Sequence, residues 1–291
     1  MIISASRRTD LPRFYARWLL QRLASGFCLV PNPCYPSQVH RVDLRPEAVD
    51  AIVFWTRYPQ PLLRYLDELQ DRGYRFIFQI TFNQYPPRYE KNAQSAANVL
   101  KAFEQLAARI GRQRIIWRYD PIFFADGLEP DFHLKNLDWI GRQLDGCVER
   151  LVISLLDEYR TVRARLHQAN CHYQGDPAHQ PGVRSFLTDL AFIARDHHFV
   201  VSSCAEPEDY TDLGIPPGAC IDHELLNRLF GLNLRYKKDP SQRQRCLCTQ
   251  SRDIGLYQTC PAGCVYCYAS NRTEAVLRNY KNHHAESETL I

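Results

Sequence analysis

Short apolar runs, each followed by an amphipathic stretch, recur along the chain and predict a regular alternation of strands and helices. The runs are rich in β-branched and aromatic residues, which is typical of parallel strands that are buried on both faces. Six runs fit this description: Ile2–Ala5, Ala51–Trp55, Phe76–Thr81, Ile115–Tyr119, Leu151–Leu155 and Phe199–Ser203. A further run, Ile254–Tyr257, predicts a seventh strand near the end of the sequence.

The stretches between these runs carry apolar residues three and four positions apart, so each predicts a helix that packs one stripe on the sheet. One such stripe consists of Leu100, Phe103, Leu106 and Ile110. Asp10 can cap the first helix, with Pro12 in its opening turn. Gly73 and Gly111 stand where two later helices are expected to end.

This alternation predicts an α/β fold and favours a TIM-type (β/α) barrel, complete or partial, over an open doubly wound sheet. No glycine-rich fingerprint of a dinucleotide or P-loop site follows any of the strands. We expect residues 1–240 to form the barrel body and residues 241–291 to form a cysteine-rich iron-sulfur segment that completes the same domain. The segment Gly26–Arg41, with three prolines and two cysteines, predicts an inserted hairpin or lid.

Polar side chains follow most of the predicted strands at the point where each strand ends. In a parallel barrel this edge forms the mouth in which substrates bind, whereas the plainer interpretation is that each strand becomes polar on reaching solvent. The predicted cofactor or substrate contacts at this edge are Arg7, Arg8, Asn83, Arg118 and Asp120. Asp157 is a further candidate, with Asp120, for orienting a substrate or a ribose.

Composition narrows the class of protein. The 291 residues include 36 basic and 32 acidic side chains, and the net charge of +4 is spread along the chain, so it does not indicate nucleic-acid binding. The sequence lacks the apolar run of a signal peptide and any membrane-spanning stretch, which predicts a cytoplasmic protein without membrane contact. Eleven cysteines in such a chain are expected to be free thiols, and clustered ones are expected to be metal ligands.

Three of these cysteines form a tight loop motif. Cys260, Cys264 and Cys267 follow the spacing C-x3-C-x2-C, and Pro261 and Gly263 shape the first part of the loop. Such a loop can place each thiolate on a different iron of a [4Fe-4S] cluster and leave the fourth iron without a protein ligand. A structural zinc site fills four positions, often with paired C-x2-C motifs, so this spacing suits zinc less well.

Four further cysteines complete a second set. Cys204, Cys220, Cys246 and Cys248 together supply four thiolates, which is the complement of a second [4Fe-4S] cluster or of a structural zinc site. A rival interpretation is that Cys246 or Cys248 becomes the fourth ligand of the first cluster and closes it. The remaining cysteines lack partners at ligand spacing and are interpreted as packing or surface thiols: Cys28, Cys34, Cys147 and Cys171.

The segment CPAGCVYCYA resembles the cluster loop of radical S-adenosylmethionine enzymes, with Tyr266 in the aromatic position before the last cysteine. The wider chain resembles the bacterial family called domain of unknown function 1848, through SASRRTD, VFWTRYP, WRYDPI, SCAE, CID and the terminal cysteine segment. RYDPI also resembles a motif of spore photolyase relatives. The resemblance implies a [4Fe-4S] cluster at this loop, S-adenosylmethionine as cofactor, a 5′-deoxyadenosyl radical, and a reductant such as ferredoxin or flavodoxin, whereas the second cluster is predicted from the count of the other cysteines.

Two features depart from the radical enzyme pattern. The cysteine loop lies near the C-terminus instead of after the first strand, and a circular permutation of the barrel would reconcile this. Ile254–Tyr257 would then open the cluster loop, Ala269–His283 would form its helix, and the Ile2 strand would be the next neighbour in the sheet. No Gly-Gly-Glu follows, so the resemblance assigns no S-adenosylmethionine contacts.

The sequence leaves other functions open. If protein ligands occupy every iron, the chain is a non-catalytic iron-sulfur protein of electron transfer or redox sensing. If zinc occupies the thiols, the chain is a zinc-stabilised binding module. The catalytic residues and the substrate are not identified, and DNA, RNA, a peptide or a metabolite would each be compatible with the mouth of the barrel.

Overall fold

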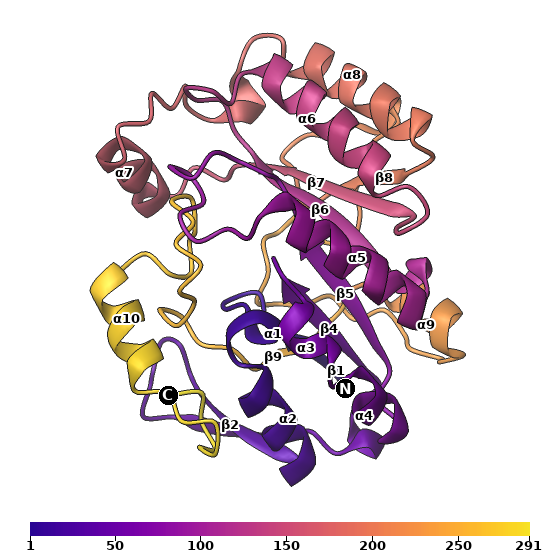
Figure 1. Cartoon of the computed structure of the whole chain (residues 1–291), viewed down its shortest axis with the longest axis vertical. Coiled ribbons are helices and arrows are strands. Elements are labelled where there is room, and N and C mark those ends of the chain that lie inside the picture. Colours follow the sequence, from indigo (N-terminus) through magenta and orange to yellow (C-terminus); the bar gives the residue numbers. More distant parts are fainter.

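The computed structural model describes all 291 residues and contains one seven-stranded sheet, in the order β8-β7-β6-β5-β4-β1-β9 (Figure 1). Every neighbouring pair in this sheet is parallel. The strands are β1 (Ile2–Ala5), β4 (Ala51–Thr56), β5 (Phe76–Thr81), β6 (Ile115–Ile122), β7 (Arg150–Leu155), β8 (Val200–Ser203) and β9 (Arg252–Asp253). The predicted α/β fold is confirmed, whereas closure of the sheet into a barrel stays a prediction.

The helices alternate with these strands as expected. They are α1 (Leu11–Phe14), α2 (Ala16–Ser25), α3 (Gln60–Leu63), α4 (Leu66–Asp71), α5 (Ala96–Ile110), α6 (Pro130–Gln143), α7 (Arg160–Gln168), α8 (Val183–Asp196), α9 (His223–Phe230) and α10 (Thr273–Lys281). Asp10 caps α1 as predicted, because its Oδ1 accepts a hydrogen bond of 3.1 Å from the Arg13 backbone N–H. None of the helices combines the length and the apolar character that crossing a bilayer requires.

The two faces of the sheet carry different cores, because alternate residues of a strand point to opposite faces. The larger core contains Phe54, Phe78 and Trp117 and is covered by helices that include α5, α6 and α8, which lie along one side of the strands in Figure 1. A smaller core on the other face packs strand residues against α9 and cysteine-bearing loops: Val53, Ile77, Ile116, Cys220, Leu225, Leu226, Cys246 and Cys248. Segments from late in the sequence therefore cover the second face.

The last strand lies beside the first. β9 pairs in parallel with β1, with Ile3 opposite Arg252 and Ser4 opposite Asp253, so the predicted neighbour of the Ile2 strand is confirmed. The prediction of a strand at Ile254–Tyr257 was wrong, because the pairing with β1 ends at Asp253 and the chain turns at Tyr257 and Gln258, where Gln258 has a φ of +59°.

The helix after the cysteine loop is shorter than predicted. It covers Thr273–Lys281 instead of Ala269–His283, because the residues before it close the loop. The Asn271 and Arg272 backbone N–H groups both donate to Gln258 Oε1, at 3.1 and 2.9 Å, and so cannot enter the helix earlier.

The inserted segment Gly26–Arg41 forms a hairpin, which is one of the two structures predicted for it. β2 (Phe27–Pro31) pairs antiparallel with β3 (Val39–Asp43). The C-terminal segment lies against it, because the Leu29 backbone N–H donates to the Glu288 carbonyl at 2.9 Å. Figure 1 shows the C-terminus beside β2 accordingly.

Candidate iron-sulfur and cofactor site

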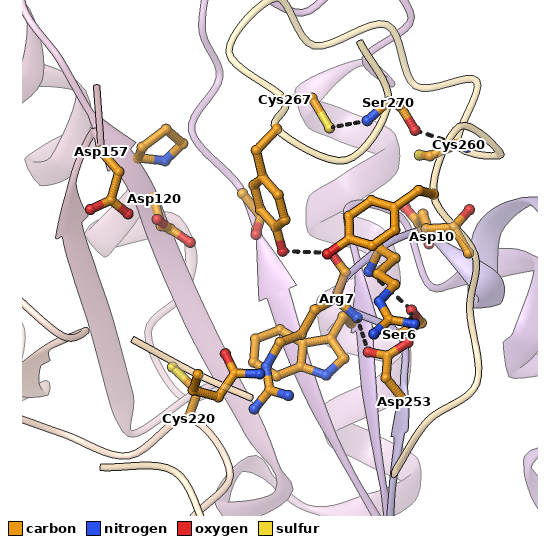
Figure 2. A pocket seen from close by; sticks show the side chains of 18 of the residues that line it. Ser6, Arg7, Asp10, Asp120, Asp157, Cys220, Asp253, Cys260, Cys267 and Ser270 are labelled. Atoms are coloured by element: carbon orange, nitrogen blue, oxygen red, sulfur yellow. Dashed lines mark hydrogen bonds between the residues drawn. The ribbon is translucent and has the colours of Figure 1, made fainter. Parts of the chain in front are cut away.

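A cavity of about 810 Å³ lies at the carboxyl ends of the parallel strands. Its wall contains two groups of thiols, which we call the loop triad (Cys260, Cys264 and Cys267) and the four-cysteine group (Cys204, Cys220, Cys246 and Cys248). Figure 2 shows Cys260 and Cys267 at the upper end of this pocket and Cys220 at the lower end, with Arg7 between them. The two groups that the sequence analysis treats separately therefore line one cavity.

The loop triad is held by a compact loop. Gly263 adopts a φ of +75°, a conformation that glycine takes without strain, and this turns the chain between Cys260 and Cys264. The Ser270 backbone N–H donates to Cys267 Sγ at 3.3 Å, and the Cys260 backbone N–H donates to Ser270 Oγ at 3.2 Å. These bonds bring the first and last cysteines of the loop back together.

The cysteine loop docks on the segment around residue 90. Cys264 forms an antiparallel bridge with Glu90, and the Val265 backbone N–H donates to the Tyr89 carbonyl at 3.0 Å. Cys267 lies close enough to Cys260 and Cys264 for their thiolates to repel one another. Burial raises the pKa of Cys264 to about 11, while the nearby Arg57 guanidinium acts in the opposite direction.

A buried network of Arg57, Glu90 and Tyr266 packs against the cysteine loop. Glu90 Oε2 lies 2.5 Å from Arg57 Nη2, and Glu90 Oε1 accepts a hydrogen bond of 2.5 Å from the Tyr266 hydroxyl. Arg57 Nη1 donates to the same hydroxyl at 3.0 Å, and the Arg57 backbone N–H donates to Asp10 at 2.9 Å. The sequence analysis did not identify Arg57 or Glu90 as site residues, and Glu90 lies in an irregular segment without periodicity.

The four-cysteine group assembles from three separate segments. Cys204 Sγ and Cys220 Sγ are 3.2 Å apart, Cys220 contacts Cys248, and Cys248 contacts Cys246. Hydrogen bonding from Cys248 lowers the pKa of Cys246 to about 7. All four are free thiols. The proximity of Cys246 and Cys248 to this group counts against the rival interpretation in which one of them closes the first cluster.

Four of the five predicted strand-end contacts line the cavity: Arg7, Arg8, Arg118 and Asp120. Asn83 is instead buried behind the wall, where its amide group donates to the Asp120 carbonyl at 2.9 Å and accepts from the Asp120 backbone N–H at 3.0 Å. It therefore positions Asp120. Asp157 also lines the cavity and pairs with Arg243.

Asp120 is already engaged by protein partners. Its Oδ2 accepts from Arg118 Nε at 3.0 Å and from Nη2 at 2.6 Å, and its Oδ1 accepts from the Ser154 hydroxyl. Burial opposes ionisation, but Arg118, the Ser154 hydroxyl and Arg243 together outweigh it and lower the pKa of Asp120. Asp120 is therefore a fixed carboxylate on the cavity wall.

Four residues that line the cavity carry a buried polar atom without a hydrogen-bond partner in the protein: Arg7 Nη2, Thr9 Oγ1, Trp55 Nε1 and Ser251 Oγ. The guanidinium carbons of Arg7 and Arg118 lie 5.0 and 5.3 Å from the Trp55 ring centre. Because a buried donor without an acceptor costs free energy, this part of the wall is suited to a bound group that brings acceptor atoms.

The remaining cysteines take no part in the cavity. Cys28, Cys147 and Cys171 are buried elsewhere, and Cys34 is exposed. No group of three or more His, Cys, Asp or Glu side chains is arranged to hold a single metal ion.

The chain belongs to the family described as Domain of unknown function (DUF1848), whose model matches residues 2–269. The match includes both thiol groups and every strand of the seven-stranded sheet. A search of curated proteins found no match.

Proposed function

We propose that this family member is a radical S-adenosylmethionine enzyme in which Cys260, Cys264 and Cys267 hold a [4Fe-4S] cluster. One observation carries the proposal. The cysteine loop brings three thiols to the cavity wall, while the other four cavity thiols contact one another, so the loop supplies three ligands and not four. Three protein ligands leave one iron for a small molecule.

The bound cluster and S-adenosylmethionine would supply the radical chemistry. Cys260, Cys264 and Cys267 would hold the cluster, which with an electron from a reductant such as ferredoxin or flavodoxin would supply radical chemistry for abstraction of a hydrogen atom from the substrate. The protein supplies binding, orientation and exclusion of water. A cavity of about 810 Å³ lies within the range of cofactor and substrate sites.

Residues of the wall can hold the methionine end of this cofactor. Arg7 Nη2 and Trp55 Nε1 are buried donors that lack acceptors, and a carboxylate would supply them. Arg8 also lines the cavity, with its guanidinium carbon 5.0 Å from the Tyr257 ring centre. We assign carboxylate binding to Arg7 and Arg8, and we leave the substrate open.

The Arg57–Glu90–Tyr266 network has a different role. Glu90 is only 2% exposed, so it does not face the cavity. The network instead fixes the docked cysteine loop and places the Arg57 guanidinium beside Cys264. A positive charge next to a thiolate favours its ionised form. The network therefore positions the cysteines that we propose as iron ligands.

Anaerobic reconstitution with iron and sulfide tests the proposal. The expected result is a protein whose reduced-state EPR spectrum changes on addition of S-adenosylmethionine and which releases 5′-deoxyadenosine with dithionite as reductant. The Cys264→Ala variant should lose both signals. Cys34→Ala, which removes an exposed thiol outside the cavity, should keep both.

Two results would overturn the proposal. Iron that binds with full stoichiometry but leaves the EPR spectrum unchanged by S-adenosylmethionine would indicate an electron-transfer or redox-sensing protein. A colourless protein with stoichiometric zinc and no bound iron would indicate a zinc-stabilised module.

A further inference from the structure

Cys204 and Cys220 form a close pair of thiols in the cavity wall, outside the loop triad. We propose that this pair is a redox-active dithiol, which a small disulfide compound such as oxidised glutathione converts to an internal Cys204–Cys220 disulfide. The pair is therefore a site of covalent modification. The proposal stands on the geometry of these two thiols and does not require a cluster or S-adenosylmethionine at the loop triad.

The two sulfurs are already in contact. Cys204 Sγ and Cys220 Sγ are 3.2 Å apart, and both cysteines are free thiols that line the cavity. A disulfide bond is about 2.05 Å long, so bond formation requires the sulfurs to approach each other by only about 1 Å. A small shift of two side chains is therefore sufficient.

This contact fits a disulfide better than the metal sites that the sequence predicts for the four-cysteine group. Thiolates that bind different irons of one cluster are held apart by it, whereas these two sulfurs touch. A zinc site needs four ligands around one ion, and no group of three or more ligands is arranged in that way. The pair of thiols is the unit that the geometry supports.

The backbone holds the two cysteine-bearing segments beside each other. Cys204 directly follows β8, and the Ser203 backbone N–H donates to the Pro216 carbonyl at 2.9 Å. In return, the Gly218 backbone N–H donates to the Ser203 carbonyl at 2.8 Å. Gly218 permits this approach, because a Cβ atom there would lie 2.5 Å from Ser202 Oγ. Formation of the disulfide therefore needs no change in how the segments pair.

The sheet also anchors each cysteine separately. The Cys204 backbone N–H donates to the carbonyl of Ile153, in β7, at 2.9 Å. Gln79 Nε2, from β5, donates to the Cys220 carbonyl at 2.8 Å. The two thiols are thus held in place by strands that lie beneath them, and their contact does not depend on the loop that joins them.

Exchange with oxidised glutathione proceeds in two balanced steps. Cys204 is half-buried and Cys220 is buried, so Cys204 meets the oxidant first. The Cys204 thiol loses its proton and attacks one sulfur of glutathione disulfide, which breaks that sulfur–sulfur bond and releases one glutathione thiol. The Cys220 thiol then loses its proton and attacks Cys204 Sγ, and the second glutathione leaves as a thiol. Two protein thiols are oxidised, and one glutathione disulfide is reduced.

The two steps differ in rate. Hydrogen bonding to Cys220 and burial raise the pKa of Cys204, so little of the attacking thiolate is present at pH 7 and the first step is slow. The second step is intramolecular and fast, because the two sulfurs are in contact. The mixed disulfide with glutathione therefore does not accumulate in the unmodified chain.

Mass spectrometry of the reconstituted chain tests the proposal. The protein is kept anaerobic in buffers of oxidised and reduced glutathione, quenched with acid and alkylated. Trypsin leaves both cysteines in one peptide, residues 196–228, so the disulfide is expected as a loss of two hydrogens from this peptide. Cleavage after Glu208 then gives two fragments that stay joined only by the disulfide. Dithiothreitol should reverse the change.

Two variants separate the steps of the exchange. In Cys220→Ser the second step cannot occur, so this chain should retain one glutathione on Cys204. In Cys204→Ser the first step is lost, so the peptide should stay unchanged. Cys147→Ser removes a buried thiol outside the cavity and should oxidise as the unmodified chain does.

Thermal unfolding gives a second measurement. The disulfide restricts the unfolded chain between residues 204 and 220, and closing a loop of this size should raise Tm by about 6–12 °C. Tm of Cys204→Ser should not respond to oxidised glutathione. An unchanged Tm of the unmodified chain, with no loss of hydrogens from the peptide in a large excess of oxidised glutathione, would overturn the proposal.

Two other results would overturn it as well. One is a disulfide between Cys246 and Cys248 in place of the proposed one, which the tryptic peptide 246–252 would reveal. The other is stoichiometric zinc, or a second set of about four iron, that protects all four cysteines from oxidation. None of these measurements uses S-adenosylmethionine, so failure of the dithiol and failure of the enzymatic proposal are distinguishable.

Discussion

Replacing Glu90 by glutamine isolates the contribution of the buried network below the cysteine loop. Glu90 is 2% exposed and pairs with Arg57 at 2.5 Å, while its other oxygen accepts from the Tyr266 hydroxyl. In Glu90→Gln the side chain keeps its size and still accepts from Tyr266. It loses the negative charge, and its amide group faces a guanidinium that has no other carboxylate partner.

The expected cost follows from the burial of this pair. Removing one partner of a buried ion pair costs about 3–5 kcal/mol, because the other charge stays buried and uncompensated. We expect the lower end, about 3 kcal/mol, since Arg57 keeps its 3.0 Å bond to the Tyr266 hydroxyl. At about 2–4 °C per kcal/mol for a chain of this size, Glu90→Gln should lower Tm by about 6–12 °C.

A matched control separates the effect of burying the ion pair from the effect of removing one negative charge. Glu68→Gln breaks an ion pair with Arg72 on the exposed surface of α4, with exposed side-chain fractions of 44% and 38%, and should cost under about 1 kcal/mol. Both variants are compared by thermal unfolding and by urea unfolding at pH 7. The reasoning is refuted if Glu90→Gln and Glu68→Gln lower Tm by the same amount.

A double variant tests whether the penalty arises from the unpaired charge. Arg57→Met combined with Glu90→Gln removes the charge that the single variant leaves unpaired. The double variant should therefore be more stable than the sum of the two single losses by about 1–3 kcal/mol. Purely additive losses would show that the pair is not coupled.

Three further substitutions test other parts of the fold. Burial lowers the pKa of His133 to about 4, below its ordinary value. The free energy of unfolding should therefore fall by about 2–3 kcal/mol between pH 7 and pH 4.5, because only the unfolded chain takes up the proton readily in this range. Urea unfolding of His133→Gln at the two pH values should lack this part of the fall. Phe103→Ala, at a fully buried position on α5, should cost about 3–5 kcal/mol in urea unfolding at pH 7. Asp253→Ala removes the acceptor of three hydrogen bonds from the end of β1 and of one from the Gly255 backbone N–H, so it should lower Tm and speed proteolysis after residue 250.

Local patterns predicted the strands well because each strand is buried and its apolar content is a property of its own residues. Six predicted strands agree with the structure, with ends that differ by up to three residues. The largest difference is at β6, which continues to Ile122 through Asp120 and Pro121. Its polar residues lie on the cavity wall, so hydrophobicity alone could not place the end of this strand.

The parts of the site that escaped prediction depend on contacts between distant segments. Glu90 has no local pattern, and its role arises only because Cys264 docks beside it. Asn83 was placed correctly at a strand end, but the turn after β5 directs its side chain to the backbone of Asp120 and away from the cavity. Residue type and strand end predict which edge of the sheet is polar and not which side chains face a ligand.

The pairing of β9 with β1 explains how thiols from the end of the sequence reach the mouth of the sheet. Asp253 accepts from the Ser4 and Ser6 hydroxyls and from the Arg7 backbone N–H, so the segment before the cysteine loop is tied to the first strand. The cavity depends on which strands are neighbours in the sheet and not on their order in the chain. A cysteine loop near the C-terminus can therefore stand beside the arginines of the first strand end, and the two ends of the chain together build one wall of the site.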